Sequence, residues 1–507
     1  MLINNFVFKL FRKRIESLNF ARENPEEAQE RIFKSLINAG KNTEYGIKYN
    51  FKGVRNIEDF RKIVPISDYS SLKPYIDRMR GGENNILWNT PIKWFAKSSG
   101  TTASKSKFIP VSKECLEDCH FSGSKDVTIQ YLLNNPNSKL LLGKSLTLGG
   151  SQEIDELNGN VRHGDLSAVM IKNSPLYAEL VRTPQKKIAL MHNFDEKTKA
   201  IAKYSSKQNV VSFAGVPSWN HVLMNRILEY TNKNHLLEIW PNLEVFFHGG
   251  VAFGPYIELF KRIIPSEKMQ YMETYNASEG FFAYQDDNSD NSMLLHTHNN
   301  VFFEFMPTTE YGSSNPKTYS ISEVEIGVNY VLIVSTNAGL WRYLIGDTIK
   351  FTSLYPHKIK ITGRTAHYIN VFGEELIVAN AEEALKKTCE ETSAIVSEYT
   401  VAPIFMSETT KGSHEWLIEF DTNPLNIEQF AEILDKALCE VNSDYEAKRQ
   451  NNITLSRLKI TSLQKGTFIN WMESKGKLGG QNKIPRLSNS REYADQLLRI
   501  ANTLQVK

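Results

Sequence analysis

The sequence has few cysteines, no long apolar run and almost no net charge. Four cysteines in 507 residues do not indicate a disulfide framework of the kind that holds small secreted domains together. No stretch approaches the roughly 18 consecutive apolar residues that a membrane-spanning helix needs, so we expect no transmembrane segment. The formal net charge is +3, from 60 basic and 57 acidic side chains. Because the chain also lacks a block of like charges, we expect no nucleic-acid partner.

A short apolar stretch lies near the N-terminus, from Phe6 to Phe11, and basic residues follow it at 12–14. A secretory signal places its basic residues before the apolar segment and ends in small residues, and this segment does neither. It indicates an amphipathic first helix that packs on the domain, with contact to a membrane surface as the alternative. We therefore expect a cytoplasmic protein, and we expect it to be a monomer.

Short apolar runs ended by turn residues begin near residue 210. They lie at 210–214, 243–247, 302–305 and 330–335, and stretches with helical periodicity separate them. Runs of this length predict buried strands of a mixed α/β sheet. The first part of the chain is mostly helical in pattern, with apolar residues at helical spacing in 26–39.

A domain boundary is predicted near residue 360. Residues 358–362 alternate like a half-buried strand and end at Gly363 and Arg364. Beyond them, helices are predicted at 381–389 and 427–441, and strands at 395–401 and 416–420. We therefore predict an α/β protein with a large N-terminal mixed α/β domain (1–360) and a smaller, mobile C-terminal α/β domain (364–507).

The segment from 97 to 110, KSSGTTASKSKFIP, concentrates hydroxyl side chains and lysines around Gly100. Such a loop presents hydroxyl and backbone N–H donors, and its ammonium groups offset negative charge, as a triphosphate requires. It is not a P-loop, because Lys105 stands where the second glycine of that motif would be. Since most Ser- and Thr-rich loops bind nothing, the loop by itself does not establish a phosphate site.

Further segments carry acids next to turns. YNASEG at 275–280 places the hydroxyl of Ser278 and the carboxylate of Glu279 before a glycine. GLWRYLIGD at 339–347 ends in Asp347, an acid suited to the vicinal hydroxyls of a ribose. GRT and INVFGEE then follow at the predicted domain boundary.

Taken in order, SSGTT, YNASEG, WRYLIGD, GRT and INVFGEE resemble the motifs of the adenylate-forming superfamily, which includes the acyl-CoA synthetases and firefly luciferase. Within it, the chain is most similar to the plant auxin-responsive acyl-acid amido synthetases and their bacterial relatives. Four further segments are similar in sequence to the same family. They are residues 64–69, 215–219, 249–250 with 255–256, and 481–486. Each motif alone is weakly specific, but the ordered set covers nearly the whole chain.

The resemblance implies ATP and Mg²⁺ as cofactors and a role for each motif. The ATP phosphates would be held by Ser98, Ser99, Gly100, Thr101 and Thr102, with Lys107 close by. The adenine and the α-phosphate would lie against Tyr275, Asn276, Ala277 and Ser278, with Gly249 and Gly250 in the same nucleotide-binding set. Glu279 would bind Mg²⁺, and Asp347 would accept the ribose hydroxyls with Arg342 nearby. Arg364 would lie at the hinge, and Lys483 would swing in to meet the phosphate or the adenylate.

The implied activity is ATP-dependent acyl-acid amido synthesis, in which a carboxylic acid becomes an acyl adenylate and an amino acid then takes the acyl group. Mg²⁺, the loop donors and a lysine would stabilise the charge that develops as one anion attacks another. Two alternatives stay open: transfer of the acyl group to coenzyme A, and a nucleotide-binding sensor without turnover. Apolar residues in 115–135 and 216–219 would line the acid pocket.

Two positions depart from the plant relatives. Ser104 replaces a glycine of the phosphate loop, and Trp341 replaces a tyrosine before the arginine. Neither change removes a group that does chemistry.

Two other clusters have a simpler structural interpretation. His296 and His298 share one face of a predicted strand, but no third ligand is evident, so we expect strand-surface histidines. Cys115 and Cys119, with His120 next to them, lack a partner CxxC and are expected to be core or surface thiols.

Overall fold

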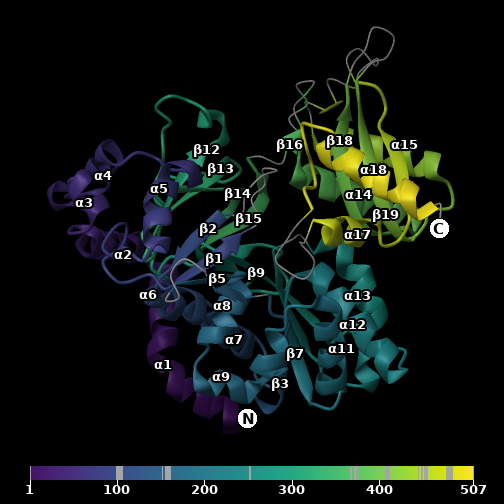
Figure 1. Cartoon of the computed structure of the whole chain (residues 1–507), viewed down its shortest axis with the longest axis horizontal. Coiled ribbons are helices and arrows are strands. Elements are labelled where there is room, and N and C mark those ends of the chain that lie inside the picture. The colour runs from purple at the N-terminus through teal and green to yellow at the C-terminus, as the bar shows by residue number, and fades with distance from the viewer. Residues whose placement is uncertain are drawn as a thin grey trace. The chain divides into compact units, whose positions relative to one another are not determined.

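The structure, a computed structural model, describes residues 2–98, 107–150, 152–154, 161–250, 253–365, 368–369, 371, 374, 376–405, 412–442, 445–446, 449, 455–475 and 484–505 (Figure 1). The chain forms two compact units. The first contains residues 1–250 and 266–360, and the second contains residues 251–265 and 361–507. The sequence placed 251–265 in the N-terminal domain, whereas the structure groups this segment with the second unit.

A mixed sheet of eleven strands is the centre of the first unit. In spatial order the strands are β12 (Val301–Pro307), β13 (Asn329–Thr336), β14 (Tyr343–Leu354), β15 (His357–Arg364), β11 (Met293–Leu295), β10 (Gly280–Tyr284), β9 (Gln270–Ala277), β8 (Val245–Gly249), β7 (Val210–Gly215), β3 (Lys144–Thr147) and β6 (Arg182–Thr183). From β9 to β6 neighbouring strands run parallel. The pairs β9–β10, β10–β11, β11–β15, β12–β13 and β13–β14 are antiparallel.

The apolar runs of the sequence become buried strands of this sheet. The four predicted strands are confirmed as β7, β8, β12 and β13, and the predicted mixed α/β class is confirmed with them. Helices α11 (Phe194–Ser205) and α12 (Pro217–Thr231) pack on each other and lie beside β7 in Figure 1. The parallel strands need apolar side chains on both faces, which explains why they are continuous apolar runs instead of alternating ones.

A smaller sheet in the first unit has the order β2 (Lys107–Val111), β1 (Trp94–Ser98), β5 (Arg162–Gly164) and β4 (Gln152–Ile154). The helices of this unit are α1 (Leu2–Glu23), α2 (Pro25–Gly40), α3 (Glu44–Lys48), α4 (Ile57–Ile63), α5 (Tyr69–Arg80), α6 (Lys113–Cys115), α7 (Ser122–Asn134), α8 (Leu166–Asn173), α9 (Leu176–Val181) and α10 (Lys186–Ala189), besides α11 and α12. Helix α2 covers the helix predicted at 26–39 and buries Ile32, Phe33 and Leu36. The Phe33 ring lies 5.0 Å from that of Phe302 on β12, so α2 packs on the antiparallel half of the sheet.

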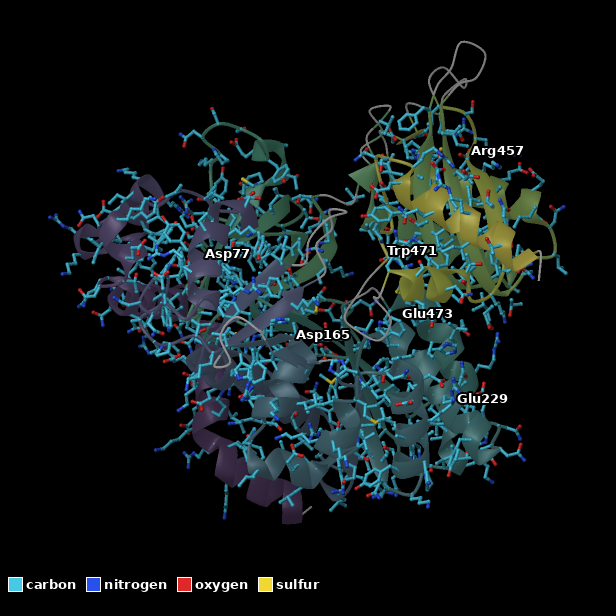
Figure 2. All side chains as sticks on the ribbon, viewed as in Figure 1. Asp77, Asp165, Glu229, Arg457, Trp471 and Glu473 are labelled. Atoms are coloured by element: carbon cyan, nitrogen blue, oxygen red, sulfur yellow. The ribbon has the colours of Figure 1, made fainter. Side chains whose placement is uncertain are left out.

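The second unit is built on a three-stranded sheet with the order β18 (Ile395–Ile404), β19 (Ser413–Thr422) and β20 (Lys459–Leu463). Its other elements are β16 (Tyr368–Ile369), β17 (Leu376–Ile377), α14 (Val378–Thr392), α15 (Ile427–Val441), α17 (Thr467–Ser474) and α18 (Glu492–Gln505). The helices and strands predicted between 381 and 441 are confirmed as α14, β18, β19 and α15. Trp471, labelled in Figure 2, joins α17 to α18: its ring lies 5.9 Å from that of Tyr493, and its Nε1 donates to Gln496 Oε1 (3.0 Å).

Segment 251–265 belongs to the second unit because of a buried polar cluster around Tyr256. The segment contains a 3₁₀ turn (Gly254–Tyr256) and α13 (Ile257–Ile263). The Tyr256 hydroxyl donates to Glu398 on β18, and Arg486 donates to Glu398 Oε2 (2.6 Å) and to Tyr256 Oη (3.2 Å). Arg486 lies in one of the segments that resemble the family, and its described contacts stabilise this unit.

No helix in the described part of the chain is both long enough and apolar enough to cross a lipid bilayer.

Candidate nucleotide-binding site

The carboxyl ends of the parallel strands bring several predicted segments to one edge of the sheet. Strands β7, β8 and β9 are in parallel register, so Gly215, Gly249 and Ala277 end them on the same side. In open α/β sheets, ligands bind in the crevice outside such strand ends. Three segments that are far apart in the sequence therefore lie at the edge where a ligand site is expected. They are residues 215–219, 249–250 and 275–279.

A hydrogen bond joins the YNASEG and WRYLIGD segments. Tyr275 on β9 donates its hydroxyl to Asp347 Oδ2 on β14, at 2.7 Å. Strands β9 and β14 are four positions apart in the sheet order, which in a flat sheet would separate them by about 19 Å. A tyrosine and an aspartate cannot span that distance, so the sheet must curl to bring the two strands together.

The curled sheet places two predicted site residues side by side. Tyr275 is 6% exposed, so its ring is held between the strands while its hydroxyl fixes the Asp347 carboxylate. A carboxylate held in this way can accept hydrogen bonds from the hydroxyls of a ribose. The structure thus brings together the residues predicted to bind the adenine and the ribose.

Glu279 lies in the short turn between β9 and β10, where Gly280 is paired with Ala277. Its neighbour Ser278 is 6% exposed, and Glu279 itself is 8% exposed. A Cβ added to Gly280 would lie 2.9 Å from Phe282 and 3.2 Å from Val301, which explains the glycine after the acid. Mg²⁺ is usually held by one or two carboxylates together with substrate phosphates, so a buried glutamate at this edge fits a magnesium-binding role.

His120 contacts Asn276 of the candidate nucleotide-binding site, and the sequence did not predict this contact. A π-helical turn (Leu116–Phe121) joins α6 to α7, a geometry often found at functional sites. The turn places His120 Nδ1 3.0 Å from Asn276 Oδ1. Burial lowers the pKa of His120 to about 4, although the Asn276 hydrogen bond opposes the shift. The imidazole is therefore neutral. Because the amide oxygen of Asn276 only accepts hydrogen bonds, His120 Nδ1–H is the donor. This bond orients the Asn276 side chain so that its amide nitrogen points away from His120.

Replacing His120 with alanine is expected to raise KM for ATP about tenfold, because the Asn276 amide loses the partner that orients it. His120→Gln keeps an N–H donor and is expected to restore most of the affinity. ATP titrations of both variants at fixed acid concentration measure the effect. An unchanged KM in His120→Ala would show that Asn276 does not need this hydrogen bond.

The same histidine makes stability depend on pH. Between about pH 6.5 and 4, His120 binds a proton in the unfolded chain but not in the folded chain. The contribution of His120 to the free energy of unfolding therefore falls as the pH falls through this window. His120→Gln lacks this contribution, and its urea midpoint is expected to fall less steeply than that of the parent between pH 7 and 4.5. Parallel slopes for the two proteins would contradict the prediction.

The two cysteines of the neighbouring segment are core thiols. Cys115 and Cys119 are both buried. Phe281 N donates to Cys119 Sγ (3.2 Å), and Asn299 donates to the Cys119 carbonyl (2.8 Å). These contacts attach the π-helical turn to β10 and help to hold His120 in place.

Arg342 was expected to lie near the ribose, but the structure places its guanidinium in the interior of the first unit. All five N–H donors bond to protein: to both oxygens of Glu304 (2.9 Å each), to the Arg61 and Val64 carbonyls (3.0 and 2.7 Å), and to Thr318 Oγ1 (3.1 Å). An arginine has five such donors, so none remains for a nucleotide. We therefore propose that Arg342 positions the start of β14, which carries Asp347.

Arg342→Met is expected to destabilise the first unit by about 3–5 kcal/mol, because it removes the two shortest charged contacts of the buried Glu304 carboxylate and leaves it Thr318 and a longer contact to Arg61 (3.4 Å). Urea unfolding followed by tryptophan fluorescence measures the loss. Arg12→Met is the matched control, because Arg12 pairs with Glu16 at the surface. Below the unfolding transition the folded variant should keep its KM for ATP, and a large rise there would favour direct nucleotide contact.

Trp341, which departs from the plant relatives, is a core residue. Its ring is buried, lies 4.7 Å from that of Phe51, and donates Nε1–H to the Leu87 carbonyl (3.0 Å). A Cβ added to Gly40 would lie 2.6 Å from the ring, so the indole fills the space that this glycine leaves.

The remaining predicted residues divide between described and undescribed parts of the chain. Ser98 ends β1 and is paired with Lys107 at the start of β2, so the two ends of the hydroxyl-rich loop predicted to bind phosphate are adjacent. Gly249 has no room for a Cβ, which would lie 2.3 Å from the Thr274 carbonyl oxygen, and Gly250 has a positive φ of 87°. Arg364 ends β15. Outside the described residues lie Ser99, Gly100, Thr101, Thr102, Ser104 and Lys483. The roles expected of these residues remain predictions.

The fold is that of the adenylate-forming enzymes. A solved 2-hydroxyisobutyryl-CoA ligase in complex with an acyl-AMP matches 96% of this chain and 94% of its own, with a TM-score of 0.60 and 13% identity. The solved GH3.15 acyl acid amido synthetase matches 97% of this chain and 95% of its own, with a TM-score of 0.80 and 18% identity.

The chain belongs to the GH3 family: the family's N-terminal domain matches residues 14–269, its central domain residues 294–364 and its C-terminal domain residues 379–492. Among curated relatives, the indole-3-acetic acid-amido synthetase GH3.4 of Arabidopsis thaliana is 23% identical over 93% of this chain and 91% of its own length.

Proposed function

We propose that the protein is an ATP-dependent acyl-acid amido synthetase. It converts a carboxylic acid and ATP into an acyl adenylate and pyrophosphate, and then transfers the acyl group to an amino acid with release of AMP. The Tyr275–Asp347 hydrogen bond carries this proposal, because it builds a ribose-binding carboxylate at the carboxyl edge of the parallel strands. Membership of a family whose named relatives are amido synthetases supports it.

The residues at the edge have complementary tasks in this scheme. Asp347 accepts the ribose hydroxyls, the Tyr275 ring and the Asn276 amide bind the adenine side, and the hydroxyl-rich loop that begins at Ser98 holds the phosphates. Mg²⁺, held by Glu279 together with the phosphate oxygens, would withdraw charge from the phosphates while the acid's carboxylate attacks the α-phosphate. Lys483 would then meet the adenylate, with Arg364 at the hinge.

The acid is proposed to bind next to the carboxyl end of β7. Helix α12 begins there with Pro217, and its buried Trp219 packs on Phe194 of α11 with the rings 5.1 Å apart. These aromatic side chains favour an acid with an apolar or aromatic body.

Pyrophosphate release with Mg-ATP, screened over a panel of carboxylic acids with mixed amino acids, tests the proposal. Acid-dependent release with AMP formation supports adenylation, and acceleration by one amino acid identifies the acceptor. Acceleration by coenzyme A instead of any amino acid would reassign the second step. ATP binding without release under any acid would leave a nucleotide-binding sensor.

A cytoplasmic location and a monomeric state belong to the same proposal. Cell fractionation tests the location. Size-exclusion chromatography with light scattering tests the state: a mass near 57.9 kDa is expected for one chain.

A further inference from the structure

Two histidines outside the nucleotide site are buried beside an aspartate from another element. His296 and His298 follow β11, and Asp126 lies on α7, which Figure 1 shows beside α1. The Asp126 side chain is 0% exposed and those of His296 and His298 are 1% and 12% exposed. The expectation of strand-surface histidines without a third ligand is therefore wrong, because folding brings in a carboxylate from 170 residues away.

The three residues point ligand atoms at a common region. His296 Nε2 lies 2.8 Å and His298 Nε2 lies 3.9 Å from Asp126 Oδ2. One ligand atom from each residue lies within 4.8 Å of the others. Tetrahedral zinc with ligands at 2.0–2.2 Å needs ligand atoms about 3.4 Å apart, so small side-chain rotations close the remaining gap.

Among the described residues, hydrogen bonding leaves His298 Nε2 open to a ligand, whereas His296 Nε2 is bonded to Asp126 Oδ2. His298 Nε2 and His296 Nδ1 are buried and have no hydrogen-bond partner in the described part of the chain. Thr297 between them is fixed, because its hydroxyl donates to the Ala21 carbonyl (3.1 Å) and its carbonyl accepts from Gln29 (2.8 Å). An imidazole nitrogen without a hydrogen-bond partner can take a metal ion as its ligand.

The charges around Asp126 include one competitor. Arg14 donates to Asp126 Oδ1 (2.8 Å) and Oδ2 (2.5 Å), and its side chain remains 27% exposed. A carboxylate has about four lone-pair positions, and carboxylates that bind metals are commonly hydrogen-bonded by further residues. Arg14 can therefore stay bonded to Asp126, but its positive charge weakens binding of a cation.

We propose that Asp126, His296 and His298 form a binding site for a divalent transition-metal ion of the zinc type. Two imidazoles and one carboxylate are a common ligand set for such ions, with a water molecule in the fourth position. The ion links α7 to the segment between β11 and β12, and the partial exposure of His298 gives it a path from solvent. The site is independent of the nucleotide-binding edge and of the proposed function.

Metal titration of the full-length protein tests the site. The protein is treated with chelator, dialysed into buffer with excess Mg²⁺ and without ATP, and titrated with Zn²⁺ by calorimetry and with Co²⁺ by visible absorption. One saturable ion per chain is expected, with the Co²⁺ spectrum of a nitrogen- and oxygen-ligated ion and a raised melting temperature. Absence of saturable binding overturns the proposal.

Three variants locate the ion. His298→Ala removes a ligand that makes no hydrogen bond to the described residues, so the variant should fold, and it should bind Zn²⁺ at least tenfold more weakly. Arg14→Gln removes the competing charge and should bind at least tenfold more tightly. His192→Ala, at an exposed histidine, should bind like the parent. Unchanged affinity in both His298→Ala and Arg14→Gln would place the ion elsewhere, for example at a cysteine, and overturn the proposal.

Discussion

Glu279→Gln is expected to lower kcat for acid-dependent pyrophosphate release by about 10²–10³-fold, because the variant loses the carboxylate that we propose holds Mg²⁺ against the developing charge. The glutamine has nearly the same shape, so the turn between β9 and β10 should keep its conformation. The Mg²⁺ concentration for half-maximal rate should rise in parallel. Steady-state rates over a magnesium series, with thermal melting as a check of folding, measure both effects.

A second acid on the adjoining segment controls for charge. Asp287 is an exposed residue of the turn after β10 and accepts hydrogen bonds from Ser289. Asp287→Asn removes one negative charge at the opposite end of β9 and β10 from Glu279, so its rate and magnesium dependence should equal those of the parent. If the two variants behave alike, Glu279 acts only through the general electrostatic field and the magnesium assignment is wrong.

Asp347→Ala is expected to lower kcat/KM for ATP by about 10²–10³-fold, mainly through KM, because each hydrogen bond between a hydroxyl and a carboxylate contributes about 1.5–3 kcal/mol. The loss should be smaller with 2′-deoxy-ATP than with ATP, since the deoxy nucleotide already lacks one of the two hydroxyls. Initial rates with both nucleotides, measured for parent and variant, give the double comparison.

Tyr275→Phe is the matched variant for Asp347. It keeps the ring, which is proposed to bind the adenine, but removes the hydroxyl that bonds to Asp347 Oδ2. We expect a loss of about tenfold or less, because the carboxylate remains and only its orientation is relaxed. If Asp347→Ala costs no more than Tyr275→Phe, the aspartate has a structural role in joining β9 to β14 and does not bind the ribose.

The strands of the sheet were readable from the sequence because burial on both faces imposes a local pattern. The runs at 210–214 and 330–335 lie in β7 and β13, where the structure buries nearly every side chain. Helix α2 was readable for the same reason, since one apolar face must pack on the sheet. The side-chain hydrogen bond between Tyr275 on β9 and Asp347 on β14 has no local signal, because it depends on the order of strands that are far apart in the chain.

The sequence by itself determined the fold class, the ordered motifs that place the chain in its family, and the acids Glu279 and Asp347. Only the tertiary structure decided which partners several polar side chains contact. Arg342 bonds to Glu304, which is 38 residues away in the sequence. His120 contacts Asn276 and Asp126 contacts His296, over 156 and 170 residues. The tertiary structure also groups residues 251–265 with the second unit, where the Tyr256 hydroxyl donates to Glu398. The physical reason is that buried polar groups must find partners wherever the fold provides them, whereas apolar periodicity is set by each element alone.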